Sequence, residues 1–535
     1  MRRPLRLLIP LLMATLACST VTNFFTIPGP EDLATDAVGV PSRTPVAATK
    51  APAATRTPAQ PAASLTPPAT PEALPFTLDE ADDAQAALLP ADAADAAALP
   101  AATRYVIDVA VGVDGTRSAA YSGREAIRYT NRESAPLATL VLMLWPNYRE
   151  QYVGGLTLGR VTVGGAEVKP EIFNGGLAAR VALAQPLAPG ASIDLEAEFS
   201  GHAEDSGGNL ARFGLTQGVL LAPTFYPLIP RIVNGEWQTV RPPDGGDTTN
   251  SDTSFYAWRV TAPVGLAVAA SGVIASQEKT GDTQTQTLFS GPMRDIALVV
   301  GPLQLTQRTL ADGVVLNVWV LAEHKDEAAA LLDQAGTQEE NLDNLVGAYP
   351  FAELDVVDAP GAYGGVEYPG LVFIGVVDAF RGYEEATVHE VGHQWFYSLI
   401  GDDQLTQPWL DEAAASYTEV LYQEKTGGPQ AAADAVENFR GYLNAASDPD
   451  LPVGRGVGDY PGPSDYGAIV YGKGALFFDA LRRQLGDETF FKFLHNYYAK
   501  YRYGFADSAG FEATAEETCG CDLKGLFDEW VFGPQ

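Results

Sequence analysis

The stretch VHEVGHQWFYSLIGDDQLTQPWLDEAAASYTEV, residues 388–420, decides how the second half of this chain folds. It opens with HEVGH, residues 389–393, and side chains four positions apart lie one turn apart on the same face of a helix. The polar run GDDQLTQP then interrupts the helical pattern, and a second helix is predicted to begin near Trp409. If the two helices pack antiparallel, Glu412 lies against the two histidines.

Two imidazoles on one helix face and a carboxylate from a second helix can hold one zinc ion. We therefore predict that His389, His393 and Glu412 are ligands of a single Zn²⁺, which leaves the fourth position to water. Glu390 projects beside the ligands and can take a proton from that water. A structural zinc site normally uses four protein ligands, often cysteines, so three ligands favour a catalytic site. The other three histidines are isolated in the sequence and are predicted to be surface or packing residues.

HEVGHQWF, with eighteen residues between its second histidine and the glutamate of WLDEAAASY, resembles the gluzincin zinc metallopeptidases of the aminopeptidase N family. GGVEY, residues 364–368, is similar to the Gly-x-Met-Glu-Asn exopeptidase motif of that family. VYGKG, residues 470–474, is similar to its Tyr-Glu-Lys-Gly segment, and FDEWVFGP is like the close of its catalytic domain. The resemblance covers roughly residues 101–535. It implies an aminopeptidase that hydrolyses N-terminal residues from peptides by zinc-activated water.

The resemblance also implies roles for single residues. Glu367 would bind the free α-ammonium group of the substrate, and Tyr471 would donate its hydroxyl to the oxyanion of the tetrahedral intermediate. Glu419 lies seven residues after Glu412 and hence on the same helical face. It is predicted either to hydrogen-bond a ligating histidine or to belong to a solvated face.

The chain departs from the family pattern at three positions, with Val366 for Met, Tyr368 for Asn and Ala413 for Gly. It also has no clear counterpart of the second group that binds the substrate amine, or of the helical C-terminal domain of larger members. A more open site is therefore expected. An endopeptidase, or a surface-tethered binding module with a peptidase fold, remain alternatives to the aminopeptidase.

The order of the predicted elements indicates an α+β multidomain fold. Residues 101–302 alternate in short strand-like runs separated by turns, which predicts an antiparallel β-domain. Residues 303–535 begin with strands and a helix over 326–345 and then become mainly helical. By resemblance, the first is a saddle-like domain and the second a thermolysin-like catalytic domain.

The N-terminal residues carry the pattern of an export signal. Residues 1–18 combine three arginines, a short apolar run and an ending TLAC that resembles a lipoprotein cleavage box. We expect an exported protein, secreted or anchored by a lipid on Cys18, which would be its only membrane contact. Residues 19–100 are rich in Pro, Ala and Thr and are predicted to form a disordered linker.

The formal net charge of −33 argues against nucleic acid as a partner, because binding of phosphates relies on Lys and Arg. Such a field mildly favours cationic substrates, including free peptide N-termini. Cys519 and Cys521 flank one glycine, and a bond between them would close a very small ring. The spacing therefore favours two thiols.

Overall fold

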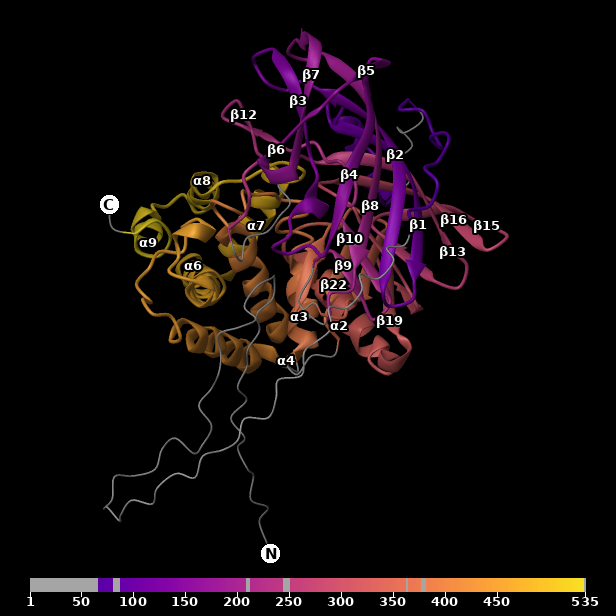
Figure 1. Cartoon of the computed structure of the whole chain (residues 1–535). Coiled ribbons are helices and arrows are strands. Elements are labelled where there is room, and N and C mark those ends of the chain that lie inside the picture. Colours follow the sequence, from indigo (N-terminus) through magenta and orange to yellow (C-terminus); the bar gives the residue numbers. More distant parts are fainter. Residues whose placement is uncertain are drawn as a thin grey trace, which may run out of the picture.

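The computed structural model describes residues 66–79, 87–207, 212–243, 251–361, 364–376 and 382–533. Strands coloured indigo to magenta form one side of the molecule, and orange and yellow helices form the other (Figure 1). This order confirms the predicted α+β fold class, with a β-rich region followed by a mainly helical one.

The β-rich region is built on an eight-stranded sheet of order β15-β16-β13-β1-β2-β8-β4-β5. Its strands are β1 (Thr103–Asp114), β2 (Ser118–Thr130), β4 (Gly154–Val163), β5 (Ala166–Val168), β8 (Ser192–Glu204), β13 (Ser254–Pro263), β15 (Val273–Thr280) and β16 (Thr283–Met293). One pair departs from the predicted antiparallel pattern, because β1 and β13 are paired in parallel. Parallel neighbours need a long crossover connection, and most of the β-domain lies between these two strands.

Smaller sheets complete this region. They are a four-stranded sheet of order β14-β17-β10-β9, a three-stranded sheet of order β3-β7-β6 and a separate two-stranded hairpin, β11-β12. The strands are β3 (Leu137–Met143), β6 (Glu171–Phe173), β7 (Ala178–Leu187), β9 (Gly214–Thr216), β10 (Val219–Pro223), β11 (Ile232–Val233), β12 (Glu236–Trp237), β14 (Ala267–Ala270) and β17 (Ala297–Gly301).

The second region starts with a five-stranded mixed sheet of order β18-β19-β20-β22-β21 and continues in helices. Its strands are β18 (Leu303–Thr309), β19 (Val315–Leu321), β20 (Glu353–Asp358), β21 (Gly365–Tyr368) and β22 (Leu371–Ile374). Its helices are α2 (Ala328–Leu345), α3 (Tyr383–Gly392), α4 (Trp409–Leu443), α5 (Pro463–Tyr466), α6 (Gly474–Leu485), α7 (Asp487–Tyr501), α8 (Ser508–Cys519) and α9 (Lys524–Phe527). The helix expected over 326–345 is α2, and the one expected near Trp409 is α4.

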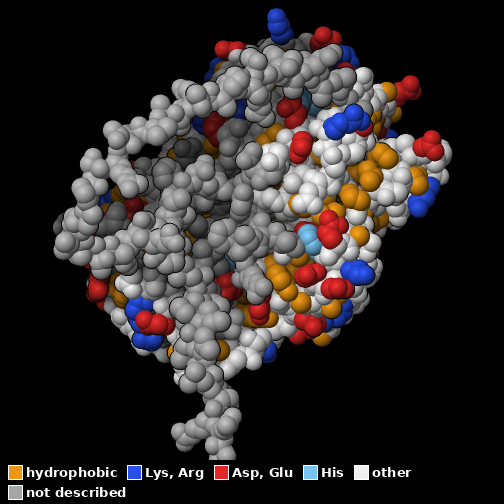
Figure 2. Space-filling model, turned by 60° about the horizontal axis from the view of Figure 1, so that its bottom comes forward, with side chains coloured by type: hydrophobic (Ala, Val, Ile, Leu, Met, Phe, Trp, Pro, Cys, Tyr) orange, Lys and Arg blue, Asp and Glu red, His pale blue; other side chains and the backbone are white. Residues whose placement is uncertain are grey.

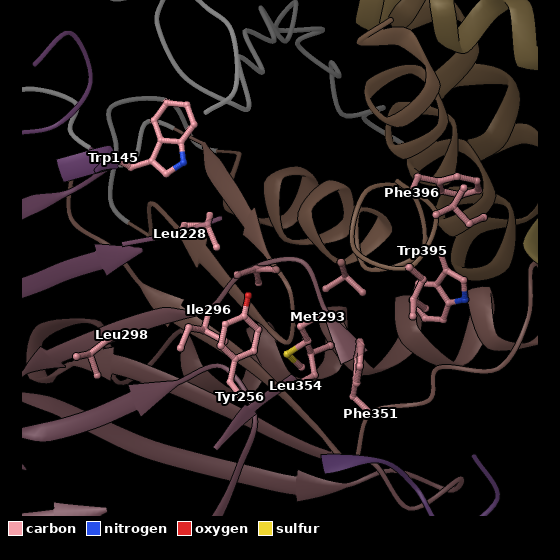
Figure 3. Close-up of a cluster of buried hydrophobic side chains, with 14 of the residues drawn as sticks. Trp145, Leu228, Tyr256, Met293, Ile296, Leu298, Phe351, Leu354, Trp395 and Phe396 are labelled. Carbon is pink, nitrogen blue, oxygen red and sulfur yellow. The ribbon is translucent and has the colours of Figure 1, made fainter. Parts of the chain in front are cut away.

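One hydrophobic core passes from the β-rich region into the helical one. In Figure 3 the side chains of Met293 and Ile296, from the end of the β-domain, lie near Leu354 of β20. Trp395, which follows the histidine motif, is also fully buried in this cluster. The two regions therefore share apolar surface that neither could bury alone.

A buried arginine joins the same two regions. Arg294 is 2% exposed and donates from Nε to the carbonyl oxygen of Tyr397 at 2.7 Å. It also donates to the carbonyl oxygens of Leu399 and Gly504, and its guanidinium lies 4.3 Å from the centre of the Phe505 ring. The turn that follows the histidine motif is thus held from the β-domain side.

The folded part of the chain begins earlier than residue 101, so the predicted linker is too long. Leu88 forms a β-bridge with Phe351, and Asp95 of the short helix α1 (Asp95–Ala98) pairs with Arg502 at 2.9 Å. Apolar and acidic residues in this Ala-rich segment therefore have partners that composition alone does not reveal.

Part of the predicted linker also packs on the β-domain. The ring of Phe76 lies 5.5 Å from that of Phe289, and Ser122 donates to the carbonyl oxygen of Pro68. The predicted signal residues 1–18 and the linker residues up to 65 lie outside the described residues.

The expectation of two free thiols near the C-terminus is wrong, because Cys519 and Cys521 form a disulfide. Gly520 adopts a left-handed conformation, with φ of 65°, where α8 ends. The chain turns back there and brings the two Cα atoms to 5.2 Å, a separation that a disulfide can bridge.

Acidic side chains are spread over the described surface in Figure 2, which agrees with the strong negative charge of the chain. Among the described helices, none has the length and apolar character needed to cross a bilayer.

Candidate metal centre and active site

Two helices, α3 and α4, position the predicted site. Their contact is close because Gly392 of the histidine motif has no side chain. A Cβ atom at this position would lie 2.5 Å from Oγ1 of Thr418 on α4. The glycine of HEVGH therefore allows α4 to approach the histidine face.

The structure brings the three predicted ligands together. Nε2 of His389 and Nε2 of His393 each lie 3.2 Å from Oε2 of Glu412, and the two nitrogens are 3.1 Å apart. All three residues are buried, with exposed fractions of 1% or less. Two nitrogens and one oxygen thus converge on one point inside the protein.

The outer nitrogens of both imidazoles are hydrogen-bonded to oxygen acceptors. Nδ1 of His389 donates to Oε1 of Glu419 at 2.9 Å, and Nδ1 of His393 donates to the carbonyl oxygen of Phe396 at 2.9 Å. With Nδ1 as the outward donor, each imidazole in its neutral form presents the lone pair of Nε2 inward, as a metal ligand must. Of the two possibilities predicted for Glu419, a hydrogen bond to a histidine or a solvated helix face, the structure shows the hydrogen bond.

This arrangement fits a divalent cation. Two inward lone pairs at 3.1 Å would repel each other, and a cation between them removes the repulsion. Nitrogen and carboxylate donors in a set of three are the ligands of catalytic zinc sites. Zinc is accordingly the ion that His389, His393 and Glu412 fit.

The electrostatics of the ligands point the same way. Burial lowers the pKa of His393, but nearby Glu367 and Glu412 outweigh it and raise the pKa to about 10. Burial would raise the pKa of Glu412, yet the charge on His393 and hydrogen bonds from both histidines hold it well below its usual range. The surroundings of the site thus favour positive charge on or between the imidazoles.

Glu390 lies beside the ligands under a strand of the sheet. A Cβ atom at Gly365 of β21 would come within 2.5 Å of Oε1 of Glu390, so only glycine leaves room for this carboxylate. Oxygen atoms of Glu390 and Glu367 and a ring nitrogen of His393 lie within 4.8 Å of one another. Burial raises the pKa of Glu390 although the charge of His389 acts to lower it, and a raised pKa suits a residue that takes up and returns a proton.

Tyr471 reaches the same centre from a π-helical segment, Gly467–Lys473. Its hydroxyl donates to Oε1 of Glu412 at 2.6 Å, and its ring stacks on that of His389 with centroids 5.7 Å apart. The hydroxyl predicted to serve the oxyanion is therefore directed into the site. Its partner in this structure is the carboxylate of Glu412.

Two polar residues of the site were missed by sequence reasoning. Nε2 of Gln404 donates to Oε1 of Glu367 at 3.3 Å and to Oδ2 of Asp411 at 3.0 Å. Oδ1 of Asp411 accepts from the backbone nitrogen of Glu412 at 2.7 Å. The one available signal was position, since Gln404 lies in the polar run between the two helices and Asp411 directly precedes a predicted ligand.

The departure from the family pattern at Ala413 has a local explanation. A Cβ atom at Gly474 would meet the Cβ of Ala413 at 2.4 Å. The methyl group of Ala413 on α4 is tolerated because the facing residue at the start of α6 is a glycine. This close packing of α6 on α4 keeps Tyr471, three residues before Gly474, near Glu412.

The part of the chain that carries this site also resembles a known protein family. Residues 341–530 match the peptidase family M1 domain. This stretch is therefore similar to the M1 peptidase domain. It contains the histidine motif, the ligand Glu412, Glu367 and Tyr471, so all the predicted site residues lie within the matched region.

Curated relatives of the M1 domain include plant and bacterial aminopeptidases. Aminopeptidase M1-B of Oryza sativa subsp. japonica is 27% identical over 257 residues, which is 44% of this chain and 29% of that protein. Aminopeptidase N of Streptomyces lividans is 28% identical over 260 residues, or 44% of this chain and 30% of that protein. The similarity thus spans less than a third of each of these relatives.

Solved structures resemble the chain over more of its length. An M1 zinc metallopeptidase from Deinococcus radiodurans matches with a TM-score of 0.61 and 21% identity, covering 80% of this chain and 93% of that one. A two-domain M1 zinc metallopeptidase mutant bound to L-arginine matches with a TM-score of 0.64 and 20% identity, covering 81% and 94%. At this identity the likeness establishes a shared two-domain fold.

Proposed function

We propose that this protein is a zinc-dependent aminopeptidase that removes N-terminal residues from peptides. The observation that carries the proposal is the convergence of His389, His393 and Glu412 at 3.1–3.2 Å, with Glu390 and Glu367 beside them. The similarity to curated aminopeptidases over the M1 domain supports it.

Each side chain of the site has a distinct task in this proposal. Bound zinc supplies a Lewis acid that acidifies water and polarises a carbonyl group. Glu390 accepts the proton of the attacking water and delivers it to the leaving amine. Tyr471 turns its hydroxyl from Glu412 to the carbonyl oxygen of the substrate, where negative charge develops.

Glu367 makes the enzyme an exopeptidase in this proposal. Its carboxylate, oriented by Gln404, binds the α-ammonium group of the peptide and so places the first peptide bond at the metal. The L-arginine-bound two-domain relative is a precedent for an amino acid bound in this fold.

The test compares matched peptides with free and acetylated N-termini. The wild type is expected to release only the first residue, and only from free peptides, with activity lost to a chelator and restored by Zn²⁺. Glu367→Gln should weaken binding of free peptides about 10–100-fold, because a hydrogen bond to a charged group is lost. Equal cleavage of acetylated peptides at internal bonds would overturn the aminopeptidase and favour an endopeptidase.

We also propose that the enzyme acts outside the cytoplasm, exported by residues 1–18. The N-terminal pattern and the disulfide Cys519–Cys521, a bond of oxidising compartments, support export. Cell fractionation of the wild type and of Cys18→Ala tests the location and the lipid anchor. Release of the variant into the medium is expected, whereas a wild type in the cytosol would contradict the proposal.

A further inference from the structure

Three carboxylates meet where helix α2 approaches the turn between β18 and β19. Asp312 lies in the turn between β18 and β19, and Glu339 and Asp343 lie one helical turn apart on α2. One oxygen from each lies within 4.8 Å of the others. Residues from two separate segments thus form a compact set of oxygen atoms.

The central member of this cluster is buried without a hydrogen-bond donor. Glu339 is 0% exposed, and neither of its carboxylate oxygens accepts a hydrogen bond from a donor in the described part of the chain. A buried carboxylate in this state must either keep its proton or have a cation beside it. Burial, followed by repulsion from Asp312, raises the pKa of Glu339 to about 9 in the ion-free protein.

The two other carboxylates are held in place by backbone groups. Oδ1 of Asp312 accepts from the nitrogen of Val314 at 3.0 Å, and Oδ1 of Asp343 accepts from the nitrogen of Tyr349 at 2.9 Å. Among the described residues, no lysine, arginine or histidine forms a salt bridge with the three acids. The nearby Arg308 pairs instead with Asp333, at 2.8 Å.

We propose that Asp312, Glu339 and Asp343 bind a divalent cation, namely Ca²⁺, at a second metal site. Three carboxylates with no nitrogen or sulfur donor are typical of hard cations, and a site open to water on one side suits the high coordination number of Ca²⁺. Asp312 is the exposed member and provides that opening. The donor set differs in kind from the His-His-Glu centre.

The place of the site in the fold indicates what the ion would do. Gln338, next to Glu339, donates to the carbonyl oxygens of Val388 on α3 and Thr418 on α4, at 3.2 and 3.4 Å. One face of α2 therefore supports the two zinc-binding helices, and the neighbouring face carries the cluster. A bound cation would tie the β18–β19 turn to α2 and stabilise this support without touching the reacting atoms.

The test uses the full chain, stripped of metal on a chelating resin and reloaded with one equivalent of Zn²⁺. Titration with CaCl₂ is followed by calorimetry and by thermal unfolding, with NaCl of equal ionic strength as reference. One Ca²⁺ per chain is expected, with Kd near the range of about 0.1–1 mM found for extracellular modules. The unfolding temperature should rise by about 2–4 °C at saturation.

Glu339→Gln should abolish this response and unfold without Ca²⁺ at a temperature equal to or above that of the wild type, since the amide copies the neutral acid. Asp312→Asn, at an exposed turn position, is a second variant that should weaken binding at least about tenfold. Glu340→Gln changes the same charge at the next, exposed position of α2 and should respond like the wild type. A wild type that shows no saturable Ca²⁺ binding, or a Glu339→Gln variant that keeps it, overturns the site.

Discussion

Glu412 and Glu339 are two glutamates of the helical region that follows the β-domain, both with 0% of their surface exposed, but their surroundings shift their pKa values in opposite directions. Glu412 faces two imidazoles and a tyrosine hydroxyl, and its pKa is lowered. Glu339 faces two carboxylates and, within the described part of the chain, no hydrogen-bond donor, and burial raises its pKa to about 9. Burial is the same in both, so the partners decide whether a buried carboxylate is ionised. Partners that favour the ionised form make Glu412 a ready zinc ligand, whereas Glu339 must lose a proton before it can bind a cation.

The largest effect on activity is expected at Glu390, the carboxylate that lies beside the zinc ligands but is not itself a ligand. Glu390→Gln should lower kcat by about 10²–10⁴-fold, because the proton acceptor is lost while the ligands remain. Zinc content by metal analysis and the unfolding temperature should be those of the wild type. Normal peptide cleavage by this variant would show that the base is assigned to the wrong residue.

Removal of the hydroxyl partner of Glu412 should have the next largest effect. Tyr471→Phe is expected to lower kcat about 10²–10³-fold with little change in KM, since the hydroxyl acts on charge that develops only in the transition state. Steady-state kinetics on a free peptide give this comparison. A change confined to KM would instead place Tyr471 in substrate binding.

The zinc site should weaken, without losing its ligands, when the outer partner of His389 is neutralised. Glu419→Gln is expected to reduce zinc affinity about 10–100-fold, because the carboxylate that orients the imidazole and increases its basicity is gone. Competition with a fluorescent chelator measures the affinity. Glu424→Gln on the same helix, whose partner is Arg482, is the matched control and should bind zinc like the wild type.

The smallest effect is a pH dependence of stability at Glu339, measured without Ca²⁺. In the folded protein Glu339 keeps its proton up to a pH of about 9, whereas in the unfolded chain it releases the proton near its ordinary pKa of 4.5. Stability from this group is therefore complete below that ordinary pKa and falls as pH rises, by at most about 1.4 kcal/mol per pH unit.

Urea unfolding of the wild type and of Glu339→Gln at pH values between 4.5 and about 9 gives the free energy of unfolding of each protein. The difference between the two proteins isolates the pH dependence that Glu339 contributes. The charged groups that face Glu339 are Asp312, Asp343 and Glu340. Parallel stability curves for the two proteins would contradict the neutral state of Glu339.

The zinc site was largely predictable from sequence because its residues obey local rules. The spacing of His389 and His393 fixes a shared helix face, and the turn before Trp409 brings back Glu412. The family resemblance supplied Glu367 and Tyr471, which no spacing rule connects to the histidines. Glu419 was placed on the correct face, but its choice between solvent and His389 depended on how α3 packs against α4.

The remaining features depend on contacts between distant segments. Gln404 meets Glu367 across thirty-seven positions, and Asp312 meets Glu339 where a strand turn approaches a helix, without a motif to mark either pair. The segment with Leu88 was taken for linker because its composition resembles one, although its few apolar residues are buried. The parallel pairing of β1 with β13 likewise follows from topology rather than from alternation.

The arginine that passes between the two domains has a mechanical consequence. Arg294 donates to backbone oxygens of the turn after the zinc helix and of the segment before α8, so separating the domains would break all of these hydrogen bonds together and expose the shared apolar core. Such a cost makes rigid-body hinge opening unfavourable and couples the melting of one domain to that of the other. The β-domain and the helical region should consequently denature in a single cooperative transition.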